Sequence, residues 1–145
     1  MVTDIIREVD PDFIITHHPD DYMPDHTATA KLVFEASFAA TVPHYQTNVK
    51  KDARVVPIYY MEPYNGLNFV PTEYVDITPY IDMKDKMLAT HESQVVWLKD
   101  HDDIDMVEVG RTISRFRGIQ CGVQYAECFS QCMVALKVTT KRMLP

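Results

Sequence analysis

The stretch that decides the fold is Asp12-Phe-Ile-Ile-Thr16, which runs directly into His17-His-Pro-Asp-Asp-Tyr-Met-Pro-Asp-His26. The first five residues follow a proline and are apolar and β-branched, which predicts a buried strand of the kind found in parallel sheets. The segment from Asp25 to about Thr41 is alanine-rich with apolar residues at helical spacing, and Asp25 is its expected N-cap. A strand that leads through a polar loop into a helix is typical of an α/β fold.

Strands and helices continue to alternate downstream. Residues 54–61 and 73–77 are predicted strands, and residues 78–98 a helix that begins with Thr78 as N-cap and Pro79 at the first helical position. The predicted class is therefore α/β, Rossmann-like, with a partly parallel sheet and flanking helices. Because doubly wound sheets usually have more than three strands, we expect residues 1–145 to be a single α/β domain that is the C-terminal part of a larger one.

The spacing of apolar residues predicts which face of each of the two later helices points inward. A further helix is predicted after Asp103, whereas the segment from Gly122 onward fits a strand or a helix. The stripe on the 78–98 helix consists of Lys84, Met87, Leu88, His91, Val95 and Leu98, and that on the second helix of Met106, Val109, Ile113 and Phe116.

The composition excludes several classes of protein. The net charge of −7 argues against a general nucleic-acid binder, which needs a basic face. No apolar run approaches the roughly 18 residues that span a bilayer, and the charged N-terminus is unlike a signal peptide. A cytoplasmic protein is the expectation. The three cysteines fit no common zinc spacing and are expected to be buried thiols.

The histidines and aspartates between residues 17 and 26 are candidates for a metal site. Ligands of open α/β sheets bind beyond the carboxyl ends of the strands, where this loop is expected. Two histidines and a carboxylate are a common shell for catalytic zinc, with nitrogen here from His18 or His26. Asp20, Asp21 or Asp25 would supply the oxygen. The alternative is a polar loop with an aspartate helix cap, which needs no metal.

Three segments, in order, resemble the LmbE-like/PIG-L family of zinc-dependent de-N-acetylases. Pro11-Asp-Phe-Ile-Ile-Thr-His17 followed by Asp21-Tyr-Met-Pro-Asp-His26 is similar to the family's second motif. Lys86-Met-Leu-Ala-Thr-His91-Glu-Ser-Gln94 is similar to its Lys…Ala-x-x-His-x-Ser-Gln helix, and Gln124-Tyr-Ala-Glu-Cys-Phe129 to its Tyr-Ala-Glu-x-Phe segment. Together they extend over nearly the whole chain, and the resemblance implies a Rossmann-like α/β fold.

The resemblance also implies roles for the residues of the loop. His26 corresponds to the family's third zinc ligand, and Asp25 to an aspartate that orients site groups. The family's first motif, Ala-His-Pro-Asp-Asp-Glu, lies well upstream of the second, so His18-Pro-Asp-Asp21 is interpreted as a look-alike and the true first motif as absent from residues 1–145. Met23 stands where many members have a histidine that polarises the carbonyl or protonates the leaving group. Tyr22 is then a candidate hydrogen-bond donor to the tetrahedral intermediate.

Two further residues have both a structural and a functional interpretation. His91 is expected to be a core histidine on its helix stripe, although the resemblance raises the alternative that His91 or Gln94 reaches the pocket floor. Glu127 is expected to be a buried structural carboxylate.

The resemblance implies a zinc-dependent hydrolase that deacylates an N-acyl amino sugar or a related small-molecule amide. We expect residues 1–145 alone to hold an incomplete site and to be inactive. The alternatives are a zinc-dependent hydratase or lyase of the same fold, acting on a small unsaturated carboxylic acid, and a non-catalytic truncated domain. Because a truncated parallel sheet exposes an edge and apolar surface, we also expect self-association into a homo-oligomer.

Overall fold

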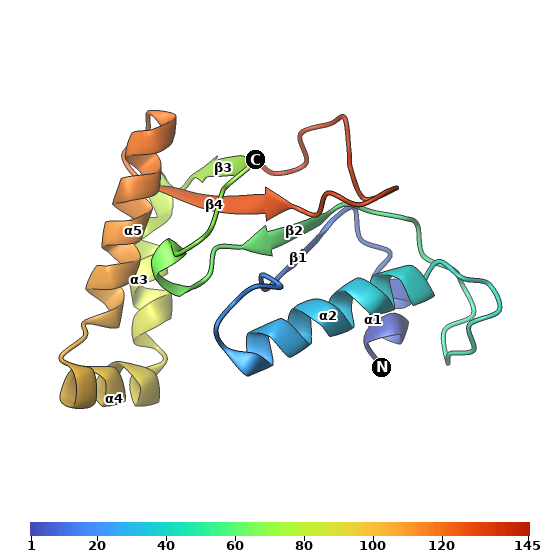
Figure 1. The fold of residues 1–145 in the computed structure, drawn as a ribbon, viewed down its shortest axis with the longest axis horizontal. Coiled ribbons are helices and arrows are strands. Elements are labelled where there is room, and N and C mark those ends of the chain that lie inside the picture. Colours follow the sequence, from blue (N-terminus) through green and yellow to red (C-terminus); the bar gives the residue numbers. More distant parts are fainter. The chain divides into compact units, whose positions relative to one another are not determined.

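The computed structural model describes residues 1–145 and contains a mixed sheet and five α-helices (Figure 1). Its strands are hydrogen bonded in the order β1-β2-β4-β3. The elements are α1 (Val2–Val9), β1 (Ile14–Thr16), α2 (Pro24–Ala39), β2 (Ile58–Met61), η1 (Tyr64–Gly66), β3 (Glu73–Asp76), η2 (Thr78–Tyr80), α3 (Ile81–Ala89), α4 (Glu92–Asp102), α5 (Met106–Cys121) and β4 (Ala126–Gln131). The α/β prediction is confirmed, and the ambiguous C-terminal segment contains a strand.

The sheet combines parallel and antiparallel pairing. β1 pairs in parallel with β2, with Thr16 opposite Tyr60, and β2 pairs antiparallel with β4, with Met61 opposite Phe129. Parallel neighbours need a crossover, and residues 17–57, including α2, supply it. The carboxyl ends of β1 and β2 therefore lie at the same edge of the sheet.

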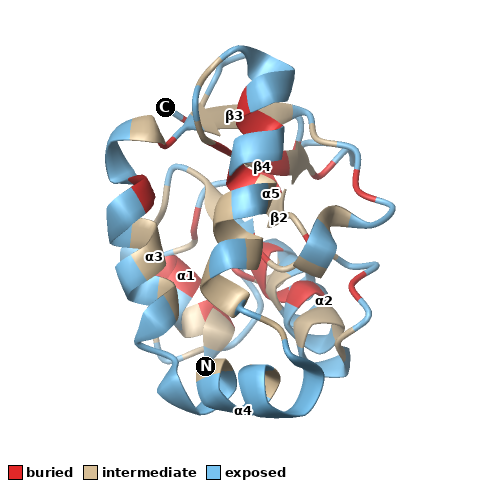
Figure 2. Cartoon of the chain, turned by 90° about the vertical axis from the view of Figure 1, so that its left-hand side faces the viewer, coloured by how far each residue is buried: buried red, intermediate tan, exposed pale blue.

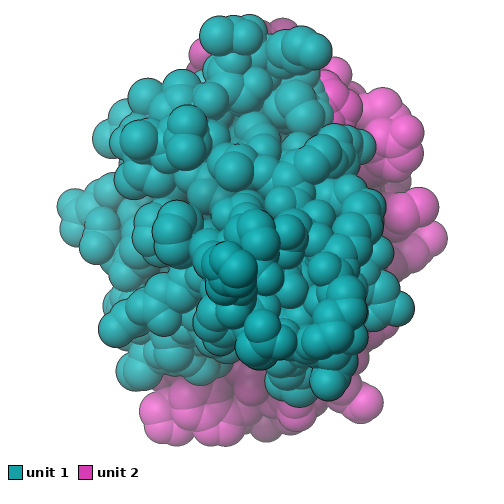
Figure 3. All heavy atoms as spheres, turned by 90° about the vertical axis from the view of Figure 1, so that its right-hand side faces the viewer, with its two compact units in different colours: residues 1–73, 129–144 teal, residues 74–128, 145 magenta.

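The chain divides into two compact units, coloured separately in Figure 3. The first comprises residues 1–73 and 129–144, and the second residues 74–128 with residue 145. No helix is both long and apolar enough to cross a membrane.

The first unit has a small apolar core and a buried arginine. Its core cluster is formed by Ile6, Ala36, Ala40 and Ala53, where small side chains let α1 and α2 approach closely. Arg7 is only 2 % exposed. Its guanidinium donates to the carbonyl oxygens of Ala40, Val42 and Val49, at 3.0, 2.7 and 3.1 Å. Since buried carbonyls need partners, Arg7 fixes the loop that follows α2.

The second unit is stabilised by the packing of α3 on α5 and by polar contacts between side chains. The Nζ atom of Lys84 lies 2.7 Å from Oε1 of Glu127 and donates to Ser114. Arg111 donates to both Asp82 and Asp85. Glu127 is thus a structural carboxylate as expected, but its side chain is 41 % exposed rather than buried.

The prediction of one helix over residues 78–98 is wrong. Residues 78–80 form the 3-10 turn η2, with Ile77 rather than Thr78 as N-cap, and α3 and α4 are separate helices. The hydroxyl of Thr90 donates to the carbonyl of Met87 at 2.6 Å, and His91 has a non-helical backbone with ψ of 56°. Hydroxyl bonds of this kind compete with helix continuation.

The break between α3 and α4 also ends the predicted apolar stripe. α4 has no buried residue and is drawn almost wholly as exposed in Figure 2. His91 is exposed, so its expected place in the core is wrong. On α5, Met106, Val109 and Ile113 are half-buried as expected, but Phe116 is 54 % exposed. Of the cysteines, Cys128 and Cys132 are buried as expected and Cys121 is exposed.

Candidate metal centre and active site

The candidate site lies where β1 ends and α2 begins. β1 ends at Thr16, residues 17–23 form a loop, and Pro24 is the first residue of α2. Met23, not Asp25, is the N-cap, because proline favours the first helical position, where its missing N–H is not needed. His26 is thereby in the first turn of α2 and faces the end of β1, where open α/β folds bind their ligands.

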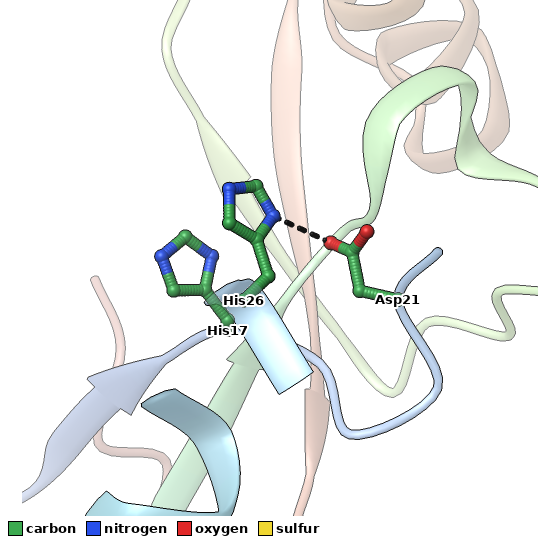
Figure 4. A group of neighbouring side chains, drawn as sticks. All are labelled: His17, Asp21 and His26. Atoms are coloured by element: carbon green, nitrogen blue, oxygen red, sulfur yellow. Dashed lines mark hydrogen bonds and ion pairs between the residues drawn. The ribbon is translucent and has the colours of Figure 1, made fainter. Parts of the chain in front are cut away.

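Three side chains converge there: His17, Asp21 and His26 (Figure 4). The Nδ1 atom of His26 lies 2.8 Å from Oδ2 of Asp21. The ring of His17 is stacked on that of His26, with centroids 3.9 Å apart and planes inclined by 13°. One ligand atom from each residue lies within 4.8 Å of the other two.

Asp21 is the anchor of the loop. Its side chain is only 3 % exposed, and its Oδ1 accepts a hydrogen bond of 3.0 Å from the backbone amide of Met23. Burial raises the pKa of Asp21, but the bonds from Met23 and His26 outweigh it, so the pKa lies below its ordinary value of 3.8. Asp21 is therefore an ionised carboxylate at neutral pH, with both oxygens accepting.

His17 and His18 are adjacent in sequence, but their rings make different contacts: the ring of His17 stacks on His26, whereas that of His18 packs against aromatic rings. The ring of His18 makes edge contacts with Tyr60 and Phe69, at centroid distances of 5.7 and 5.4 Å, and its Nδ1 accepts from the amide of Asp20. Burial is the main cause that lowers the pKa of both histidines, and the nearby His26 lowers that of His17 further. Both imidazoles are therefore neutral at pH 7.

The tetrapeptide His18-Pro-Asp-Asp21 is thus divided. Asp21 joins His26, Asp20 is exposed, and His18 packs among aromatic rings. The structure brings His17 to His26 instead, which the sequence reasoning missed. The available signal was the position of His17 immediately after the predicted strand, directed to the start of the next helix.

The remaining predicted residues differ in their surroundings. Tyr22 is 72 % exposed and Asp25 is exposed in the first turn of α2, so both side chains face solvent beside the cluster. Met23 is half-buried. His91 and Gln94 belong to the second unit and are exposed at the start of α4.

The donor types fit a zinc ion, since two imidazoles and a carboxylate are among its common ligands. The orientation of the three side chains determines which of them can bind the ion. Both oxygens of Asp21 already accept hydrogen bonds. Because the rings of His17 and His26 are nearly parallel, their lone pairs lie in separate planes and do not meet at one point. His26, through its Nε2 atom, is the residue best placed to bind a metal.

The comparison with protein families agrees with the location of this site. Residues 1–37 match the family model PIG-L, GlcNAc-PI de-N-acetylase, which confirms the resemblance to that family over the segment holding His17, Asp21 and His26.

Solved structures share the fold. The chain is similar to the 4-carboxy-2-hydroxymuconate hydratase of Pseudomonas putida, with a TM-score of 0.75 and 24 % identity over 97 % of this chain and 59 % of that one. For a conserved protein of Thermus thermophilus the TM-score is 0.73, with 24 % identity over 97 % and 60 %. For the N,N'-diacetylchitobiose deacetylase of Pyrococcus horikoshii, complexed with its inhibitor, it is 0.66, with 26 % identity over 90 % and 49 %. The chain therefore spans no more than 60 % of these proteins.

Proposed function

We propose that this chain carries part of the active site of a zinc-dependent hydrolase, which removes the acyl group from an N-acyl amino sugar or a related amide. The observation that carries the proposal is the Asp21–His26 pair at the carboxyl end of β1, inside the 37 residues that match the de-N-acetylase family model. The fold shared with a chitobiose deacetylase supports it. Residues 1–145 would be the C-terminal part of a larger domain.

The residues present fit parts of an amide hydrolysis. A bound zinc ion would polarise the amide carbonyl and lower the pKa of a water molecule. His26 would hold the ion, and the exposed hydroxyl of Tyr22 could donate a hydrogen bond to the oxygen that becomes negatively charged. The water oxygen bonds to the carbonyl carbon, the C–N bond breaks, and the amine leaves with a proton. We expect the base for the water proton, and further zinc ligands, to come from outside residues 1–145.

The test combines zinc binding with turnover. Zinc titrated into the natural gene product that contains this chain should bind, and His26→Ala should weaken that binding, whereas Glu35→Gln, which removes an exposed carboxylate from α2, should not. The natural gene product that contains this chain should release acetate from N-acetylglucosamine derivatives, and His26→Ala should stop the release. Turnover that survives His26→Ala would contradict the proposal. A gene product that neither binds zinc nor turns over the substrate would favour the non-catalytic alternative.

A second candidate function is the hydration of a small unsaturated carboxylic acid. Met23 favours it, because a thioether can neither polarise a carbonyl nor protonate a leaving amine, so a different proton chemistry would be in use. A hydratase shares the fold. The same gene product, offered both substrate classes, should then add water across the double bond of the acid and release no acetate from amides. Release of acetate alone would exclude this candidate.

A further inference from the structure

The carboxylate of Asp21 uses both of its oxygens within the loop. Oδ1 accepts from the amide of Met23 at 3.0 Å, and Oδ2 lies 2.8 Å from Nδ1 of His26. With a side chain only 3 % exposed, Asp21 has little access to solvent. It therefore links the N-cap of α2 to a side chain one turn further along, and holds both in one geometry.

This arrangement determines which nitrogen of His26 carries the proton. An ionised carboxylate can only accept hydrogen bonds, so a contact of 2.8 Å with Nδ1 requires a proton on Nδ1. In a neutral imidazole Nε2 then keeps its lone pair. Histidines that bind metals commonly donate their other ring N–H to a carboxylate, which fixes the tautomer and the ring orientation.

We propose that Asp21 is a positioning residue, which holds His26 in the Nδ1–H tautomer and thereby makes Nε2 the atom available to a zinc ion. The choice of zinc rests on the proposed function, whereas the tautomer does not. The part assigned to Asp21 is to accept this proton rather than to bind the metal, since both of its oxygens already accept hydrogen bonds and its side chain is 3 % exposed. The part assigned to His17 is to cover the face of the His26 ring, since the two rings are stacked.

The Asp21→Asn variant tests this with a minimal change of shape. An amide has one accepting oxygen where the carboxylate has two, so it can serve Met23 or His26 but not both. Loss of the bond to His26 frees the ring to exchange between tautomers. Glu35→Gln makes the same chemical change at an exposed position of α2 and is the matched control.

The first measurement needs neither metal nor substrate. Long-range nitrogen–proton NMR on the metal-free, ¹⁵N-labelled chain should show His26 with its proton on Nδ1. Asp21→Asn should give mixed tautomers, and Glu35→Gln should leave the tautomer unchanged. A wild-type His26 with its proton on Nε2 overturns the proposal, even if Asp21→Asn fails to fold.

Zinc titration of the natural gene product that contains this chain, followed at the His26 resonances, is the second measurement. Asp21→Asn should raise the Kd for zinc about 10- to 100-fold and retain binding at Nε2. If Asp21 were itself a ligand, the variant would lose zinc binding outright instead of binding more weakly, which would overturn the proposal. If the predicted tautomers are found but no substrate is turned over, the proposed function fails and the assignment of Asp21 stands.

Discussion

The ammonium group of Lys137 is buried against Ser37, to whose hydroxyl oxygen its Nζ atom donates a hydrogen bond of 3.1 Å across 100 positions of sequence. Lys137 is 6 % exposed. Burial lowers its pKa below the ordinary value of 10.5, and no carboxylate is among the groups that act on it. A buried cation without a counter-charge costs stability, because its hydration is lost and not replaced.

Replacing Lys137 with methionine should therefore stabilise the protein. At pH 7 we expect the free energy of unfolding to rise by on the order of 1 kcal/mol, since the side-chain volume is kept and the buried charge is removed. Lys141→Met, at an exposed position, should leave it within about 0.5 kcal/mol. Urea unfolding of the three proteins provides the measurement.

The lowered pKa of Lys137 also predicts how the free energy of unfolding changes with pH. The folded pKa of Lys137 is lowered, so the folded state releases this proton before the unfolded state does. The stability of the wild type should rise as pH increases from the lowered folded pKa towards 10.5, relative to that of Lys137→Met, which lacks the titration. A difference between the two proteins that stays constant up to pH 10.5 would contradict the buried cation.

Arg7→Lys should destabilise the first unit strongly although it keeps the charge. The guanidinium donates to three backbone carbonyls and lies 3.1 Å from Asp52. A lysine has a compact ammonium that cannot reach these acceptors together. We expect a loss of about 3 kcal/mol in the free energy of unfolding. Arg54→Lys, at a side chain 58 % exposed, is the matched control and should cost less than about 1 kcal/mol.

Two glycines of α5 should respond differently to alanine. A Cβ atom at Gly118 would lie 2.7 Å from the backbone oxygens of both Val123 and Gln124, whereas one at Gly110 would meet only the Cδ1 atom of Leu88, also at 2.7 Å. Each substitution gains about 1 kcal/mol of helix propensity. A leucine tip can move, whereas the backbone carbonyls are held in place. Thermal unfolding should show Gly110→Ala near wild type and Gly118→Ala destabilised by about 2 kcal/mol or more. Equal effects would contradict the difference between the two contacts.

His18→Ala should lower stability without affecting the metal centre. The ring packs edge-on against Tyr60 and Phe69, so its loss should cost about 1–2 kcal/mol. Zinc binding followed at His26 should be unchanged. If His18→Ala removed zinc binding, His18-Pro-Asp-Asp21 would be a true ligand motif, and its interpretation as a look-alike would be wrong.

Self-association is expected from the position of β1. This strand lies at one end of the sheet, so one of its edges has no neighbouring strand, and Ile15 is 42 % exposed. Open edges of this kind pair with other chains unless they are covered. Light scattering on residues 1–145 should find a dimer or larger species, and a clean monomer would contradict this expectation.

The sequence predicts best those elements whose structure is determined by residues close together in the chain. The strand at Ile14, the loop and the helix that holds His26 follow from local pattern, and they appear within two residues of their expected bounds. Which of His17 and His18 lies beside His26 depends on the contacts of His18 with Tyr60 and Phe69. Both aromatic residues are more than 40 positions away, so a local sequence pattern does not predict the outcome.

The break after α3 shows the other source of error. The spacing of apolar residues through Thr90 favours one helix, but the Thr90 hydroxyl bonds back to Met87 and His91 leaves the helical conformation. Side-chain competition for backbone groups does not appear in hydrophobic periodicity.

The discontinuous first unit has a consequence for synthesis on the ribosome. Residues 1–73 are made first, but the unit also includes residues 129–144, among them the second half of β4 and Lys137. β2 must therefore wait for its antiparallel partner while residues 62–128 are translated, which takes several seconds at typical elongation rates. During that interval the nascent chain exposes the edge of β2 that β4 will cover, and this is when we expect chaperones to bind it.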